Sequence, residues 1–238
     1  MFGSGKKVTP EQFATDVQNA LGDRLRSLVL YGSTAAGDRI EKWSDHNTLL
    51  VAGALDTDTL AALYKPVRRW MEAGNPPPRL FTEKELRESC DVFPVEMMDM
   101  KQFRKVLAGK DVLAELGVSR TNLRHQVEME LRVKLMGLRE GAMVSGCDRI
   151  VLSNLMTGSC SSILTLFRAA LRLYEEEVPA DKSLALDALA RHLPIERTPF
   201  DVILAAKTGG HGVGMEAEKL FAAYTRQIET VTEAVDAL

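Results

Sequence analysis

The N-terminal part of the chain alternates between helical periodicity and short apolar runs. The runs over 25–31 and 47–52 each have the length of a buried strand and are bounded by turn residues. A helix is predicted before the first run, with Thr9 as its N-cap, and a second helix over 56–73 follows the second run. Pro66 lies inside the second helix and predicts a kink or an early break. These patterns predict an α/β region at the start of the chain.

A run of three prolines separates these elements from a second group. A short strand is expected over 79–81, directly after the prolines. Thr82 has the position of an N-cap for a helix over 83–90, with Glu85 at the capping-box position. A strand and a helix are therefore predicted in succession.

The segment 92–100 is predicted to be a further strand. Its alternation places Val95 and Met97 on one apolar face and Glu96 on the other. Because Pro94 has no N–H group, this strand is expected at an edge of the sheet.

Beyond residue 110 the pattern changes to amphipathic helices without strand signals. Leu123, Val127 and Leu131 begin a series with heptad-like spacing. Helices are predicted from residue 122 onward and over 148–174, 184–193, 198–206 and 216–237. The sequence therefore predicts an α+β protein, with an α/β domain over residues 1–110 and an all-α helical bundle over residues 111–238.

The composition is that of an ordinary globular protein and argues against some classes of partner. Of the 238 residues, 45% are hydrophobic and 26% are charged, and the net charge of −3 offers no general attraction for nucleic acid. No run of about twenty apolar residues stands out, so a membrane is not an expected partner. The three cysteines lack metal-ligand spacing and are expected to be free thiols, which predicts a reducing, cytoplasmic location.

Polar groups gather where the first apolar run ends and the second begins. Gly32 allows a tight turn, and the Ser33 hydroxyl with the neighbouring backbone amides suits a phosphate group. Asp45 and Asn47 are two residues apart, so on a strand their side chains point to the same face. Such an oxygen pair suits Mg²⁺. Ordinary turn chemistry is the alternative interpretation, since these residue types dominate turns.

This arrangement resembles the DNA polymerase beta-like nucleotidyltransferase superfamily. The matching residues are Gly32-Ser33, an Ala-Ala-Gly-Asp connector over 35–38 and a Ser-Asp-x-Asn segment over 44–47, where the superfamily has Gly-Ser, a spacer and Asp-x-Asp. The resemblance implies a small mixed β-sheet with helices, followed by a helical domain that helps to hold an acceptor. It also implies transfer of a nucleotidyl group from a nucleoside triphosphate (NTP), with Mg²⁺ as the cofactor.

The resemblance assigns roles to individual residues. Gly32 and Ser33 would hold the triphosphate, and Asp45 and Asn47 would be metal positions, with Asp45 a catalytic carboxylate. Asn47 departs from the superfamily pattern, because an amide brings no negative charge to the metal. The sequence therefore favours one bound Mg²⁺ ion over two.

A later strand of the superfamily supplies a third carboxylate. Glu96 is the residue chosen for this metal-binding and catalytic role. Asp99, which strand alternation places on the opposite face, is the alternative. A solvent-facing glutamate is the other interpretation of Glu96.

Two classes of function follow from these features. The first is nucleotidyl transfer to an unidentified acceptor. The second is a catalytically inactive nucleotidyltransferase-like protein that binds a nucleotide or a partner, as an antitoxin-like module does. The partner would be a helical protein, and a homo-oligomer is also compatible with the sequence.

Three other motifs are interpreted as non-catalytic. The glycine-rich segment 208–214 has no Gly-Lys-Ser/Thr ending and is expected to be a flexible connector. Arg120 and His125 have the spacing of HEPN-type ribonucleases, but they stand at a helix start, which favours coincidence. His46 is expected to be a packed or surface residue that points away from the metal positions.

Overall fold

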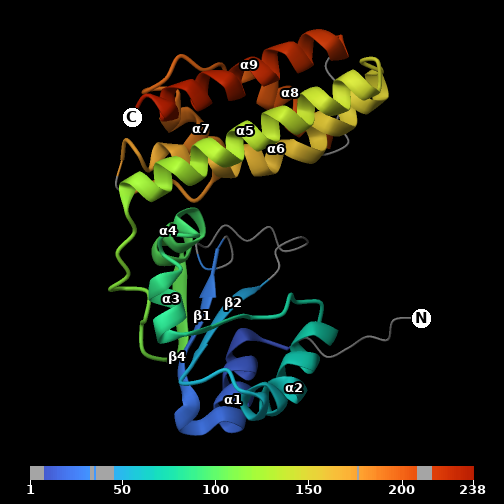
Figure 1. Ribbon diagram of the computed structural model, residues 1–238. Helices are drawn as coiled ribbons and strands as arrows, with labels where there is room; N and C mark the ends of the chain where they lie inside the picture. The colour runs from blue at the N-terminus through green and yellow to red at the C-terminus, as the bar shows by residue number, and fades with distance from the viewer. Residues whose placement is uncertain (1–7, 33–34, 36–45, 176, 208–215) are drawn as a thin grey trace, which may run out of the picture. The chain divides into compact units, whose positions relative to one another are not determined.

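The computed structural model describes residues 8–32, 35, 46–175, 177–207 and 216–238. The chain forms two compact units, Met1–Ser119 and Arg120–Leu238. The first unit contains a sheet with helices, and the described part of the second unit is helical (Figure 1). The predicted α+β class is therefore confirmed.

The sheet of the first unit is mixed and has the strand order β3-β2-β1-β4. Its strands are β1 (Leu25–Tyr31), β2 (Asn47–Ala52), β3 (Arg79–Thr82) and β4 (Arg104–Gly109). Strand β1 is antiparallel to both of its neighbours, and β3 is parallel to β2. The end of β1 and the starts of the other three strands therefore lie along one edge of the sheet.

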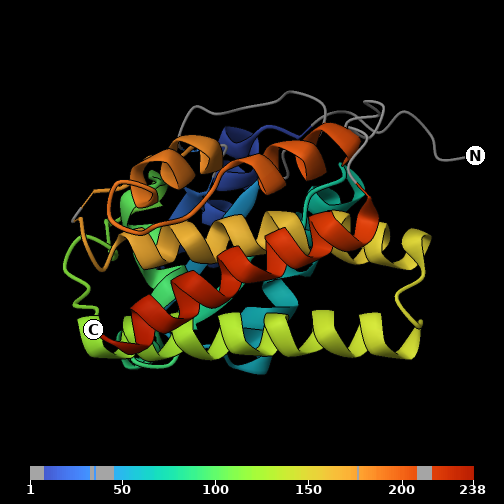
Figure 2. The same ribbon diagram turned by 90° about the horizontal axis from the view of Figure 1, so that it is seen from above.

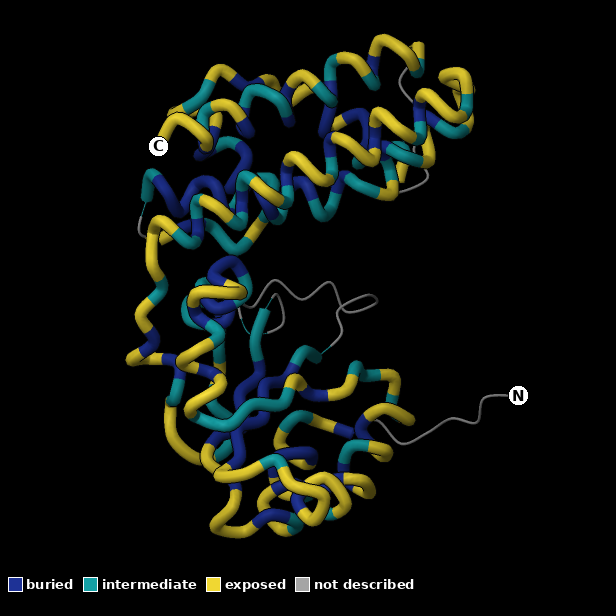
Figure 3. The backbone as a smooth tube through the Cα atoms, viewed as in Figure 1, coloured by how far each residue is buried: buried dark blue, intermediate teal, exposed yellow. Residues whose placement is uncertain are grey.

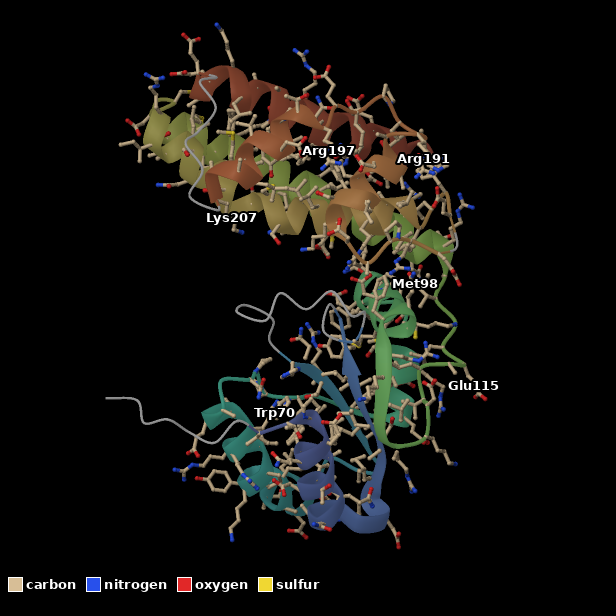
Figure 4. All side chains as sticks on the ribbon, turned by 180° about the vertical axis from the view of Figure 1, so that it is seen from behind. Trp70, Met98, Glu115, Arg191, Arg197 and Lys207 are labelled. Atoms are coloured by element: carbon tan, nitrogen blue, oxygen red, sulfur yellow. The ribbon has the colours of Figure 1, made fainter. Side chains whose placement is uncertain are left out.

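One face of the sheet packs against α1 (Pro10–Leu21) and α2 (Thr57–Glu72). Phe13 of α1 stacks on Trp70 of α2 with ring centroids 4.5 Å apart, and both rings are fully buried. Trp70 is labelled in Figure 4. This aromatic pair joins the two helices into one layer.

The other face packs against α3 (Glu83–Glu88) and α4 (Pro94–Gln102). Val29 of β1 and Leu49 of β2 lie on this face and contact a cluster that includes Met97 of α4. The central strands are dark blue in Figure 3 because both of their faces are covered. The first unit thus has three layers.

The helix starts predicted at Thr9 and Thr82 are confirmed. Thr9 and Thr82 each form a capping box, with Gln12 and Glu85 as their respective partners. Helix α2 continues through Pro66, so the early break predicted there is wrong.

The prediction of a strand over 92–100 is also wrong, because most of this segment forms α4. Pro94 is the first residue of the helix, a position where its missing N–H costs nothing. The fourth strand of the sheet is β4, which is not among the predicted strands.

The second unit is a group of packed helices. Its members are α5 (Arg120–Val144), α6 (Arg149–Leu171), α7 (Lys182–Leu189), α8 (Thr198–Lys207) and α9 (Ala217–Asp236). Helix α6 contacts each of the other four, and the long helices α5, α6 and α9 lie side by side (Figure 2). The predicted bundle of helices is confirmed.

Helix α6 is long and apolar enough to span a membrane by length and composition alone. It is the one helix among the described residues that meets this test, with a mean hydropathy of 1.5. A helix at the centre of a bundle needs the same apolar surface, and α6 buries Phe167, Leu164 and Ile163 among its neighbours.

Tyr224 offers a test of packing in the second unit. Its ring packs edge-on against Phe200 at 5.5 Å, and its hydroxyl lies 3.0 Å from Ser159 Oγ. Tyr224→Phe should lower the free energy of unfolding by about 1 kcal/mol, because Ser159 Oγ keeps its bond to Leu155 O. Urea denaturation followed by circular dichroism measures the change. Tyr64→Phe, at an exposed tyrosine, is the control and should change little; equal losses in the two variants would contradict the assignment.

Candidate active site

Gly32 begins the candidate site directly after β1. Its φ of +84° lies in the region that favours glycine. Its N–H donates to Phe103 O at 3.0 Å, and its carbonyl accepts from Ala35 N–H at 2.9 Å. The tight turn predicted at Gly32 is therefore present, and its role in phosphate binding stays a prediction.

Asn47 is the first residue of β2 and pairs with Tyr31 across the sheet. Its Nδ2 lies 3.7 Å from the position that a Cβ on Gly32 would occupy. Because Asn47 alternates with Leu49, its side chain belongs to the face covered by α3 and α4. The predicted site residues Ser33 and Asp45 lie outside the described residues.

His46 belongs to the opposite face. Its ring lies 5.8 Å from the ring of Trp70, which is part of the α1 and α2 layer. Of the two predicted environments, packed or surface, the structure shows the packed one, and the prediction that His46 points away from Asn47 is confirmed.

Glu96 lies in the first turn of α4 and not on a strand. A helix places residues three apart on one side, so Glu96 and Asp99 are neighbours on α4. The predicted placement of Asp99 on the opposite face is therefore wrong. Both residues are half-buried. An acidic side chain in a first helical turn also stabilises the helix through its dipole, which is a purely structural role for Glu96.

Tyr31 shows which charges gather at this edge of the sheet. Burial raises the pKa of the Tyr31 hydroxyl, while the charge of Arg79 and a hydrogen bond with it lower that pKa. The negative charge of Glu96 raises the same pKa further. Arg79 and Glu96 therefore both lie close enough to the Tyr31 hydroxyl to influence it.

Arg79 is a residue of this site that no sequence motif indicates. It is the first residue of β3 and pairs with Leu49 of β2, so it shares the face of Leu49 and Asn47. The predicted strand over 79–81 could have indicated this position through its register with β2. No motif marked the arginine, because its importance depends on the strand order.

Arg104 lies at the same edge as the first residue of β4, where it pairs with Tyr31. Its guanidinium donates to the carboxylate of Asp111 at 2.9 Å and also to Lys101 O. The Arg104 hydrogen bond holds the pKa of Asp111 below its ordinary value. Arg104 therefore has a structural role within the first unit.

The described residues at this edge offer hard oxygen donors to a cation. Asn47 and Glu96 supply an amide oxygen and a carboxylate, which suit Mg²⁺ better than softer metals. Among the described residues no group of three or more His, Cys, Asp and Glu side chains could hold a metal. The donor set fits Mg²⁺ in kind, with Asp45 as the remaining sequence-predicted ligand.

The other motifs carry no site in the described residues. The Arg120 guanidinium donates to Leu173 O at 2.7 Å, which gives it a structural role at the start of α5. His125 is exposed on the same helix. The glycine-rich segment 208–214 lies outside the described residues.

The three cysteines are free, as predicted. Cys90 and Cys160 are buried, and burial raises the pKa of the Cys160 thiol to about 11. A thiol with such a pKa is a poor nucleophile at neutral pH. The buried thiol of Cys160 is therefore not a candidate nucleophile.

An apolar groove of about 550 Å³ lies elsewhere on the first unit. Leu60, Tyr64 and Met71 of α2 line it together with Pro78 and Leu80. It contains none of the residues of the candidate site and belongs to the α2 side of the sheet.

Comparisons with known proteins support the fold. No protein-family model matches the sequence, and no curated protein sequence matches it significantly. Among solved structures, the chain is similar to spectinomycin adenyltransferase AAD(9) from Enterococcus faecialis, determined with ATP and spectinomycin. The TM-score is 0.56 at 15% identity, and the match covers 94% of this chain and 97% of that one. The chain therefore has the fold of a DNA polymerase beta-like nucleotidyltransferase with a C-terminal helical domain.

Proposed function

We propose that this protein transfers a nucleotidyl group from an NTP to a hydroxyl group of a small acceptor molecule. The observation that carries the proposal is the structural match, which extends over both the sheet unit and the helical unit. AAD(9) was determined with ATP and spectinomycin, so ATP is the first nucleotide to test. A small molecule with free hydroxyl groups is the first class of acceptor.

The residues of the predicted site offer groups for each part of this reaction. Gly32 and Ser33 are assigned to the triphosphate, and Asp45 and Asn47 to a divalent cation. The acceptor oxygen forms a bond to the α-phosphorus while the bond to the pyrophosphate leaving group breaks. The acceptor proton passes to a carboxylate, for which Asp45 and Glu96 are the candidates.

One Mg²⁺ ion fits this edge better than two. Asn47 lacks the negative charge of an aspartate. The attraction between two opposite unit charges 4 Å apart is about 1 kcal/mol in water and about 4 kcal/mol near a protein surface. A second dication would lose roughly twice that attraction. When bound, a single ion would neutralise part of the triphosphate charge and orient the phosphate groups.

A transfer assay tests the proposal. Each NTP, labelled at the α-phosphorus, is incubated with Mg²⁺, the protein and a panel of hydroxyl-bearing small molecules that includes spectinomycin. We expect label to move to an acceptor above the background set by Asp45→Ala. Absence of transfer, together with absence of ATP binding by calorimetry, would contradict the proposal.

A binding function without catalysis is the second candidate, and one surface of the helical unit favours it. Met129, Val133 and Met136 lie on one face of α5 at helical spacing, and their exposed fractions are 58%, 55% and 52%. The same helix buries a different face, which includes Leu131 and Leu135, in the bundle. A second apolar face is the property expected of a helix that binds a partner protein or another copy of the chain.

Light scattering coupled to size-exclusion chromatography tests this second candidate for self-association. A dimer that dissociates when Met129 and Met136 are both replaced by Glu would support it. A wild-type monomer at all concentrations would remove the homo-oligomer, and a helical partner would then be the remaining form of this candidate.

A further inference from the structure

The strand register brings an arginine next to the predicted nucleotide site. Tyr31 pairs with Asn47, and Leu49, two residues further along β2, pairs with Arg79. These residues alternate in phase, so they share the face of the sheet that α3 and α4 cover. Arg79 therefore lies at the same edge and on the same face as Asn47.

Arg79 is also accessible to a ligand. Its side chain is exposed, whereas that of Arg104 at the same edge is bound to the carboxylate of Asp111. The Arg79 guanidinium lies within hydrogen-bond reach of the half-buried Tyr31 hydroxyl. This hydrogen bond and the positive charge of Arg79 both lower the pKa of that hydroxyl. Among the described residues Arg79 interacts with the Tyr31 hydroxyl, and no ion pair of Arg79 with a described carboxylate is seen.

Charge gives the position of Arg79 a chemical meaning. Asn47 removes a negative charge from the predicted metal position, and Arg79 adds a positive charge one strand away. The missing negative charge at Asn47 and the positive charge of Arg79 both favour binding of an anionic ligand at this edge. They also make the binding of such a ligand less dependent on bound cations. A planar guanidinium also matches the oxygens of a phosphate with two parallel hydrogen bonds.

We propose that Arg79 binds the phosphate chain of the nucleotide at the edge formed by Tyr31, Gly32 and Asn47. The inference rests on the proposed nucleotide-binding function and goes beyond it in one respect. Arg79 supplies part of the positive charge that a second metal ion would otherwise bring. Tyr31 positions the guanidinium through its hydroxyl, and Glu96 limits the excess of positive charge.

Calorimetric titration of ATP into Arg79→Gln protein tests the inference, in Mg²⁺ buffer and in buffer with EDTA. We expect Arg79→Gln to weaken ATP binding by about tenfold or more in each buffer in which the wild type binds. Arg79→Lys should recover part of this loss, because it keeps the charge and loses the paired hydrogen bonds. Inorganic tripolyphosphate should compete with ATP for the wild-type protein.

Arg26→Gln is the matched control. Arg26 is exposed on β1 near the opposite end of that strand from Tyr31, so its replacement should leave ATP binding unchanged. Circular dichroism verifies that each variant is folded. If the wild type and Arg79→Gln bind ATP equally, the inference is wrong and the proposed function stands. An equal loss in Arg26→Gln would also overturn it, since general surface charge would then explain both results. Absence of ATP binding to the wild type in both buffers would overturn the inference and the proposed function together.

Discussion

Asn47→Asp should tighten divalent-cation binding by about tenfold or more. Asn and Asp have nearly the same shape, so the substitution changes charge and keeps geometry. One added negative charge at 4 Å from a dication is worth about 2 kcal/mol in water and about 8 kcal/mol near a protein surface, before the cost of desolvation. The lower limit already corresponds to more than tenfold. In the absence of metal, the same substitution should be neutral or destabilising, because Asp45 and the new carboxylate would repel each other.

Titration of Mn²⁺ by calorimetry, with and without a non-hydrolysable ATP analogue, measures the first effect, and thermal unfolding in EDTA measures the second. Asn154→Asp is the control, since Asn154 is exposed on α6 and the substitution makes the same change of net charge. Equal cation affinity in wild type and Asn47→Asp would show that Asn47 is not at a metal position. The transferase proposal would then lose the residue that links its fold to metal chemistry.

The local signals in the sequence were sufficient for most elements of the first unit. Strands β1 and β2 have the predicted bounds. The N-cap predicted at Thr9 and the capping box predicted at Thr82 both form. These features depend on a few neighbouring residues. An apolar run ended by glycine or a Thr-x-x-Glu segment has one favourable local structure, whatever the remainder of the chain does.

The segment around Glu96 shows where local signals were not enough. Alternating apolar residues from Phe93 to Met97 fit a strand, but Pro94 also fits the first turn of a helix. Packing decides between them: β4 forms the edge of the sheet beside β1, and the segment buries Met97 and Met100 against the sheet as a helix. Strand β4 carries Arg104 and Lys105 at its start and has only a short apolar run, so its sequence gives a weak strand signal.

The site was predictable in part for the same reason. The Gly32 turn and the start of β2 at Asn47 come from contiguous sequence. Arg79 enters only through the pairing of β3 with β2, and no sequence motif states that pairing. The approach of Glu96 to Tyr31 depends on how α4 packs over the sheet. Such contacts between distant segments require the tertiary structure.

Gly109→Ala should strongly destabilise the first unit. Gly109 ends β4 with a φ of +78°, and a Cβ there would lie 2.1 Å from Arg26 O and 2.8 Å from its carbonyl carbon. These are backbone atoms of the adjacent strand, so relief of the clash must separate β4 from β1. The separation would strain two neighbouring bonds, Lys110 N–H to Arg26 O at 2.9 Å and Ser27 Oγ to Lys110 O at 2.6 Å.

We expect Gly109→Ala to lower the free energy of unfolding of the first unit by about 3–5 kcal/mol, the range of exceptional single substitutions. Gly74→Ala separates the steric clash from the backbone strain at positive φ. Gly74 has a φ of +93°, but no atom lies within 4 Å of an added Cβ. Its cost should be the backbone strain alone, about 1–2 kcal/mol. Both tryptophans, Trp43 and Trp70, belong to the first unit, so denaturation followed by tryptophan fluorescence reports on that unit. Equal losses for the two variants would show that β4 can move away from β1 at no cost. In that case the close pairing of Gly109 with Ser27 would contribute nothing to holding β4 beside β1.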